Sequence, residues 1–215
     1  MSEAISVLLV DDHAVVREGY RRLLERSGNV RVVAESGNAA AAYQAFCQWL
    51  PDVVVMDISL PDLSGIEAMR RLLQREPTAR VLTFSIHEEP IFANRALSAG
   101  AMGYVTKASA PDVLVEAVLQ VAQGTRYLSP DIAQTLALSG VSGQGDLLRK
   151  LSNREFEIAR LLAQGHSVRA VADKLCLNYK TVANYQTIIR QKLDADTPAK
   201  FVRIATQHGL LNDAL

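Results

Sequence analysis

Short apolar runs alternate with amphipathic segments along the first 125 residues of the chain. The runs predict strands at residues 6–10, 30–34, 53–56, 81–84 and 103–105, because short continuous apolar runs are typical of strands buried on both faces of a parallel sheet. Helical spacing fills the gaps at residues 15–26, 39–50, 65–75, 90–99 and 111–123. Five strand–helix units in succession predict a doubly wound, flavodoxin-like α/β domain with a five-stranded parallel sheet and right-handed crossovers.

Residues that favour helix ends support these boundaries. Ser64 and Ser109 stand where N-caps are expected, and Pro111 falls in the first turn after Ser109. Gly100 and Gly124 stand just after two expected helix ends, where a left-handed backbone often stops a helix. Local chemistry and hydrophobic periodicity therefore agree on where these elements begin and end.

The rest of the chain has only helical patterns. A short one at residues 131–138 precedes a Ser/Gly-rich stretch at residues 139–145, which is expected to be a flexible linker. Further helices are expected at residues 153–163, 167–175, 179–193 and 198–208, with Asn178 and Thr197 as N-caps. The chain is therefore expected to contain an α/β domain over residues 1–127, a linker over 128–147 and an all-α four-helix domain over 148–215.

Charge differs between the two expected domains although the whole chain is neutral. Residues 1–145 hold 12 Lys and Arg against 16 Asp and Glu, whereas residues 146–215 hold 11 against 7. Chance unevenness is one explanation. A basic domain also suits a polyanionic partner, so the second domain is a candidate for nucleic-acid binding.

Several classes of protein do not fit the sequence. The chain lacks an apolar stretch of 18 residues and a recognisable signal peptide, so we expect no membrane association and a cytoplasmic location. Cys47 and Cys176 are far apart and fall on different domains, so they predict neither a disulfide nor a metal site.

Carboxylates gather at one edge of the predicted sheet. Asp11 and Asp12 follow the first strand, Asp57 ends the third, and Ser85 and Lys107 follow the fourth and fifth. Parallel strands share a direction, so these side chains converge at the carboxyl edge. Clustered carboxylates repel one another unless a cation lies between them, and their oxygens suit Mg²⁺. An aspartate neutralised in this way can act as a nucleophile toward phosphorus.

Each of these residues alone has an ordinary explanation. An acid after a strand is more often a helix N-cap, and a single Ser or Lys in a loop is usually solvated. Their joint placement favours a chemical site. A hydrolase with an aspartyl nucleophile and Mg²⁺ is one alternative, but the short loops leave no room for a substrate-covering insertion.

The second domain contains a short helix, a turn at Cys176-Leu177 and a longer helix that starts after Asn178. This is the arrangement of a helix-turn-helix, whose second helix enters the major groove of DNA. The long helix is expected to bury Val182, Ile189 and Leu193. Its opposite side would present polar side chains to bases and phosphates, namely Lys180, Thr181, Asn184, Tyr185, Thr187, Arg190 and Lys192. An ordinary helical bundle with a solvated face, or a protein-binding module, are the alternatives.

Residues 5–125 resemble the receiver domain of two-component response regulators. The resemblance rests on three motifs and one residue, namely Leu9-Val10-Asp11-Asp12-His13, Met56-Asp57-Ile58-Ser59-Leu60-Pro61 with Gly65, Ala101-Met102-Gly103-Tyr104-Val105-Thr106-Lys107, and Ser85. It implies that Asp57 accepts phosphate from a sensor histidine kinase. It also implies that Asp11, Asp12, Asp57 and the main-chain carbonyl of Ser59 hold Mg²⁺. Ser85 and Tyr104 would be the switch pair, and Lys107 would contact the phosphate.

Residues 149–211 are similar to the LuxR-type helix-turn-helix. The matching segments are Leu151-Ser152-Asn153-Arg154-Glu155, Gly165, Val171-Ala172-Asp173-Lys174-Leu175, Lys180-Thr181-Val182, Lys192-Leu193 and His208-Gly209-Leu210. Both domains together indicate the NarL/FixJ class of transcription regulators. The segments Asp131-Ile132-Ala133-Gln134 and Thr181-Val182-x-x-Tyr185 are similar to those of its GacA/UvrY-like and BvgA-like members. The resemblance implies double-stranded DNA as a partner and a homodimer on phosphorylation, with residues 198–208 at the contact.

Three positions depart from the pattern of that class. Ala183 stands where many members have a basic residue, and Tyr185 where many have His, so the DNA sequence that is bound does not carry over. Cys176 stands where Gly is frequent, and a turn that needs a left-handed backbone there would cost a little. We expect Cys176 to be a small packed residue rather than a redox sensor.

Overall fold

The computed structural model describes residues 4–26, 28–142, 146–208 and 210–211. The chain divides into two compact units, Met1–Leu136 and Ala137–Leu215. The division falls within residues 128–147. Among the described residues, no helix is long and apolar enough to cross a membrane.

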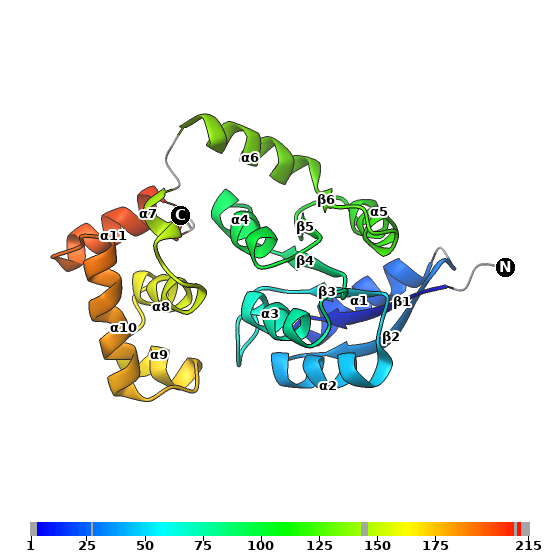
Figure 1. Ribbon diagram of the computed structural model, residues 1–215, viewed down its shortest axis with the longest axis horizontal. Helices are drawn as coiled ribbons and strands as arrows, with labels where there is room; N and C mark the ends of the chain where they lie inside the picture. Colours follow the sequence, from blue (N-terminus) through cyan, green and yellow to red (C-terminus); the bar gives the residue numbers. More distant parts are fainter. Residues whose placement is uncertain (1–3, 27, 143–145, 209, 212–215) are drawn as a thin grey trace. The chain divides into compact units, whose positions relative to one another are not determined.

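The first unit is built on a parallel sheet with the strand order β2-β1-β3-β4-β5-β6 (Figure 1). Its strands are β1 (Ile5–Val10), β2 (Val30–Ser36), β3 (Val53–Met56), β4 (Val81–Ser85), β5 (Gly103–Thr106) and β6 (Tyr127–Leu128). The first five confirm the doubly wound sheet, whose strand order reverses between β1 and β3. The prediction of five strands misses β6, because two residues give no periodic signal.

The short strand β6 forms an edge of the sheet beside β5. Gly103 pairs with Tyr127, and Tyr104 pairs with Leu128. A side chain at position 103 would place its Cβ only 2.6 Å from the carbonyl oxygen of Tyr127. Glycine at this position therefore allows the chain after the fifth helix to pair with the sheet.

Helices cover both faces of this sheet. They are α1 (Ala14–Glu25), α2 (Ala39–Trp49), α3 (Gly65–Arg75), α4 (Pro90–Ser98) and α5 (Pro111–Ala122). Helices α1 and α5 bury one face with a continuous apolar cluster that includes Val55, Leu82 and Val118. Figure 1 shows α2, α3 and α4 on the other face. All four residues of β3 are buried, as expected for a central strand that points at the site.

Ser64 is confirmed as the N-cap of α3, because its side chain accepts a hydrogen bond from the backbone N–H of Glu67. The prediction that Ser109 caps α5 is wrong. The cap residue is Ala110, which has no side-chain oxygen, and the Ser109 hydroxyl contacts Thr106 and Asp131 instead. A contact with a residue 22 positions away has displaced the local one.

Helix α6 (Pro130–Ser142) begins in the first unit and continues beyond its end at Leu136. It is longer than the helix expected at residues 131–138, since residues 139–142 of the expected flexible segment are helical. Residues 143–145 lie outside the described residues. The Gly/Ser composition of the segment did not prevent the helix from continuing.

Among the described residues of the second unit, all the regular secondary structure is helical. Its helices are α7 (Asp146–Arg149), α8 (Asn153–Ala163), α9 (Val168–Lys174), α10 (Tyr179–Lys192) and α11 (Pro198–Gln207). Helix α10 contacts both α8 and α9, and α11 contacts α8. Val182, Ile189 and Leu193 are fully or almost fully buried, which confirms the predicted inner face of α10. Asn178 and Thr197 are confirmed as N-caps.

The turn between α9 and α10 has a left-handed backbone at Cys176, with φ of 50°, the conformation that would cost a little without glycine. The expectation that Cys176 is packed is wrong, because its side chain is exposed. The turn is held from outside by Arg154, whose guanidinium donates to the carbonyl of Leu175 at 3.1 Å. Leu175 itself is buried, so the turn is anchored by this neighbour rather than by the cysteine.

Candidate functional site

Two buried carboxylates share one ammonium group at the carboxyl edge of the sheet. Asp11 and Asp57 are each only 2% exposed. The Lys107 Nζ atom lies 2.5 Å from Asp11 Oδ2 and 2.7 Å from Asp57 Oδ2. The structure thus brings together residues that directly follow β1, β3 and β5, as predicted from their positions after the strands. With both acids ionised, this buried group has a net negative charge.

The electrostatics of the group follow from burial and from this pairing. Burial raises the pKa of Asp57 above its usual value, and Lys107 opposes only part of that rise. Burial alone would lower the pKa of Lys107, but the neighbouring Asp57 and Asp11 outweigh it and raise the pKa. An ionised Asp57 is therefore held in a place where one more cation would stabilise it.

Asp12 and His13 extend the acidic group toward the surface. The ligand atoms of Asp11, Asp12 and His13 all lie within 4.8 Å of one another. The His13 backbone N–H donates to Asp11 Oδ1 at 2.8 Å, and its Nδ1 atom lies 2.7 Å from Asp12 Oδ1. Buried and exposed carboxylate oxygens side by side suit a hard divalent cation that keeps some of its water.

The loop after β3 is shaped around Asp57. The Ser59 backbone N–H donates to Asp57 Oδ1 at 3.1 Å, which fixes the carboxylate and the loop together. The Gly65 N–H donates to the Ile58 carbonyl at 2.8 Å. A Cβ atom at position 65 would lie 1.8 Å from the Asp57 carbonyl oxygen, so only glycine fits. This close approach explains the Gly65 of the motif.

Ser85 and Tyr104 are both buried beside this group. The Ser85 Oγ atom accepts a hydrogen bond from the His87 N–H at 3.2 Å, and Tyr104 donates to the His87 carbonyl at 2.8 Å. Burial raises the pKa of Tyr104, so the phenol remains a donor. The His87 ring stacks on Phe92 with centroids 4.0 Å apart.

Sequence reasoning missed His87. It is buried, and its Nε2 atom lies 3.2 Å from Ser59 Oγ. The residue stands only two positions after Ser85, but an isolated His in a loop gives no signal of such a contact. The loops after β3 and β4 are therefore joined beside Asp57.

Helix α10 presents the expected polar face, with corrections at its ends. Lys180, Asn184 and Thr187 are exposed, and Gln191 continues the same stripe, although it is absent from the predicted set. Thr181, Tyr185 and Arg190 are half-buried at the sides. The Thr187 hydroxyl donates to the Ala183 carbonyl at 3.2 Å, so its proton is already used within the helix.

Lys192 is the member of the predicted DNA-contacting set that already has an acidic partner. Its Nζ atom lies 2.8 and 2.7 Å from the two carboxylate oxygens of Glu155. Burial would raise the pKa of Glu155, but Lys192 and the Ser152 N–H outweigh burial and lower the pKa. Glu155 also closes the capping box of α8 with Ser152. The pair joins the end of α10 to the start of α8.

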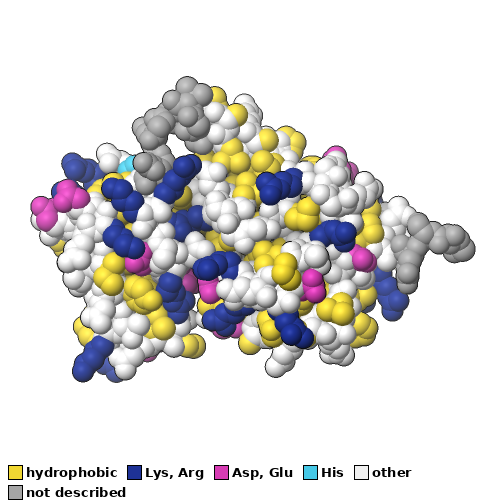
Figure 2. All heavy atoms as spheres, in the orientation of Figure 1, with side chains coloured by type: hydrophobic (Ala, Val, Ile, Leu, Met, Phe, Trp, Pro, Cys, Tyr) yellow, Lys and Arg dark blue, Asp and Glu magenta, His cyan; other side chains and the backbone are white. Residues whose placement is uncertain are grey.

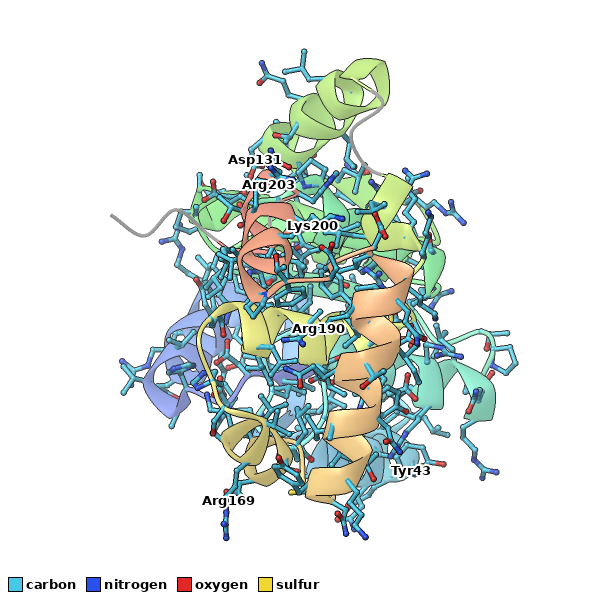
Figure 3. All side chains as sticks on the ribbon, turned by 90° about the vertical axis from the view of Figure 1, so that its left-hand side faces the viewer. Tyr43, Asp131, Arg169, Arg190, Lys200 and Arg203 are labelled. Carbon is cyan, nitrogen blue, oxygen red and sulfur yellow. The ribbon has the colours of Figure 1, made fainter. Side chains whose placement is uncertain are left out.

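Basic side chains are distributed over the surface of the second unit. Figure 2 shows Lys and Arg side chains across its visible face, with a few acidic ones between them. Figure 3 shows Arg169 extending outward from α9, the first helix of the pair. Arg169 is exposed and was not among the predicted contacts, because that set was confined to the helix expected at residues 179–193. In helix-turn-helix proteins the first helix crosses the DNA backbone.

Two family descriptions match separate parts of the chain. Residues 7–119 match the response regulator receiver domain, and residues 149–205 match the bacterial regulatory proteins of the luxR family. These ranges coincide with the two folds and with the acidic site of the first unit. The class of protein is therefore a receiver joined to a LuxR-type helix-turn-helix.

Relatives extend over the whole chain. The transcriptional activator protein ExaE of Pseudomonas putida is 41% identical over 213 residues, which cover 98% of this chain and all of that protein. The response regulator GacA of Pseudomonas aeruginosa is 38% identical over 98% of this chain and 99% of its own length. A LuxR-family response regulator from Aurantimonas has a solved structure with 48% identity and a TM-score of 0.63, covering 65% of this chain and 99% of that one. The chain belongs to the LuxR-type response regulators, a family of transcription regulators.

Proposed function

We propose that a sensor histidine kinase phosphorylates Asp57 and thereby controls dimerisation and sequence-specific binding of double-stranded DNA by α10. The observation that supports this most directly is the buried pair Asp11–Asp57 with its single ammonium, because a site so short of positive charge favours a cation and then a phosphoryl group. Since DNA is the proposed partner, we expect the protein to act in the bacterial cytoplasm.

Mg²⁺ is the cation that fits this donor set. Asp11, Asp12, Asp57 and the main-chain carbonyl of Ser59 would hold it, and it would neutralise charge on the incoming phosphoryl group. The chain's own residues do the rest. Asp57 Oδ2 attacks phosphorus, the bond from phosphorus to the donor breaks, and the donor leaves with that electron pair. Lys107 then pairs with a phosphoryl oxygen instead of the free carboxylate.

Ser85 and Tyr104 supply the proposed response to phosphorylation. The Ser85 hydroxyl can donate to a phosphoryl oxygen while its oxygen still accepts from the His87 N–H, so a shift of Ser85 toward the phosphoryl group would pull on His87. Because Tyr104 is already buried and bound to the His87 carbonyl, the change would fall mainly on the loop between β4 and α4. Rearrangement of this loop would bias a dimer or domain contact.

A labelling experiment tests the phosphoacceptor. The protein is incubated with a small phosphodonor and Mg²⁺, and the phosphorylated residue is located. We expect an acid-labile label at Asp57 that is absent in Asp57→Asn and strongly reduced in Asp12→Ala. Asp112→Asn is the matched control, because Asp112 is an exposed acid in the first turn of α5. Full labelling of Asp57→Asn would contradict the proposal.

DNA binding across a salt series tests the recognition helix. In this proposal Asn184 and the Thr187 methyl face bases, and Lys180 and Arg190 face phosphates, with residues 198–208 at the dimer contact. Asn184→Ala should cost about 1–3 kcal/mol on the specific site and little on random DNA. Lys180→Ala should weaken both alike and reduce the salt slope by about one unit. If neither change affects binding, the protein-binding alternative for this domain gains support.

A further inference from the structure

Asp131, in the first turn of α6, joins both ends of the loop that carries Lys107. Its Oδ2 atom accepts a hydrogen bond from Thr106 Oγ1 at 2.7 Å, and its Oδ1 atom accepts one from Ser109 Oγ at 3.2 Å. The two hydroxyls also lie 2.9 Å from each other. The Asp131 carboxylate therefore holds together residues 106 and 109, the two ends of this loop.

The charge on Asp131 is maintained by these contacts. Partial burial would raise its pKa, but hydrogen bonds from neighbouring hydroxyls, those of Thr106 and Ser109 among them, outweigh burial and lower the pKa. Asp131 is thus a charged acceptor at neutral pH, and bonds to a charged acceptor are stronger than those between neutral groups.

The start of α6 is fixed to the sheet independently of Asp131. The Ser129 N–H donates to the Tyr104 carbonyl at 3.0 Å, and Ile132 is 1% exposed. Helix α6 then continues beyond Leu136, where the first unit ends. The residue that closes the Lys107 loop therefore belongs to the helix that leaves the unit.

Resting on the proposed function, we infer that Asp131 is a positioning residue for Lys107 and that it couples the state of Asp57 to the first turns of α6. Lys107 spans Asp11 and Asp57 in this structure, so a phosphoryl group on Asp57 requires its ammonium to move. The backbone of the 106–109 loop moves with it, and the hydroxyls of Thr106 and Ser109 carry that movement to Asp131. Coupling of this kind is reciprocal at equilibrium, so loss of Asp131 must also alter the extent to which Asp57 is phosphorylated at equilibrium.

The experiment measures hydrogen exchange of backbone amides in residues 130–138 of the full chain, with and without acetyl phosphate and Mg²⁺. We expect phosphorylation to change exchange there in the wild-type protein. Asp131→Ala and Thr106→Val should each reduce that change at least about threefold and lower the equilibrium extent of Asp57 labelling about fivefold. Asp112→Asn, in the first turn of α5, should behave as wild type.

Additional comparisons separate positioning from a merely structural role. If Asp131 acts through Thr106, the double variant should be no worse than the more affected single variant, since the two changes remove one interaction. Asp131→Asn keeps one acceptor oxygen and should recover part of the response. If Asp131→Ala does not fold, Thr106→Val, which keeps the side-chain shape, decides the question.

Two outcomes would overturn the inference alone, and a third would overturn the proposed function. A labelled Asp57 with unchanged exchange in residues 130–138 would contradict the coupling alone. Effects of the two single changes that multiply in the double variant would contradict the path through Thr106. Absence of label on Asp57 in the wild-type protein would instead overturn the proposed function, and the inference with it.

Discussion

Asp11 and Asp57 in the first unit share one ammonium group, whereas Glu155 and Glu157 in the second unit each have a cation of their own. All four carboxylates are less than a tenth exposed. The pKa of Asp57 is raised, mainly by burial, whereas the pKa of Glu155 is lowered, because its partners outweigh burial. Burial of acids alone therefore does not identify a functional site, and the balance of opposite charge around them does.

Removing Lys107 should have the largest effect, on the rate at which Asp57 is phosphorylated. In Lys107→Met the two buried carboxylates lose the ammonium group that they share, so their mutual repulsion is no longer offset by it. Phosphorylation of Asp57 from a small donor should slow by about a hundredfold, the size expected when a preorganised charge is lost. Single-turnover labelling measures this rate. An unchanged rate would mean that the shared ammonium does not contribute to the reaction.

The equivalent change in the second unit should affect stability instead. Lys192→Met leaves Glu155 without its charged partner, and we expect a loss of about 1–2 kcal/mol, less than for a fully buried pair because Lys192 is partly exposed. Urea unfolding followed by circular dichroism measures it. Labelling of Asp57 in the same variant should be normal, and a labelling defect there would count against the distinction between the two clusters.

Magnesium should stabilise the first unit, where two buried carboxylates share one ammonium group, and not the second. At ten times its dissociation constant, Mg²⁺ should add about 1.4 kcal/mol to the unfolding free energy of the first unit. Asp12→Ala should abolish this gain, whereas Lys192→Met should retain it. Thermal unfolding with and without Mg²⁺ checks the expectation, and an equal gain in Asp12→Ala would show that the cation binds elsewhere.

The smallest expected effect is that Glu155 and Asp57 change the stability of their units in opposite directions as pH varies. The folded-state pKa of Glu155 is lowered, so its contribution to stability is full above the unfolded value of 4.5 and is lost as pH falls through the folded value. The folded-state pKa of Asp57 is raised, so its ionisation lowers stability as pH rises from the unfolded value of 3.8 through the folded value. Glu155→Gln should therefore flatten the acid limb of the stability curve, and Asp57→Asn should remove the opposite trend.

The central strands and their site were predictable because burial gives a sequence signal. Four apolar residues that end in an acid, as at residues 53–57, indicate both a buried strand and a group at its tip. Helix α10 was predictable for a similar reason, since the buried Val182 and Ile189 mark its inner face. Site residues on different strands follow once the strands are known to be parallel.

The parts that were missed depend on contacts between distant residues. Ser109 has the chemistry of an N-cap, but a partner in α6 takes its hydroxyl. The pairing of Lys192 with Glu155, which is 37 positions away, has no local signal, and the predicted DNA contact of Lys192 stays a prediction. Cys176 takes a left-handed backbone conformation without the predicted burial, because burial depends on neighbours that are distant in sequence.

The two-residue strand β6 also determines what the edge of the sheet presents to other molecules. Tyr127 and Leu128 cover the side of β5 that would otherwise expose unpaired backbone groups beside buried side chains. Exposed strand edges of this kind recruit strands from other chains and lead to aggregation. A fragment that ends at residue 126 should therefore aggregate at concentrations where a fragment that ends at Leu136 does not.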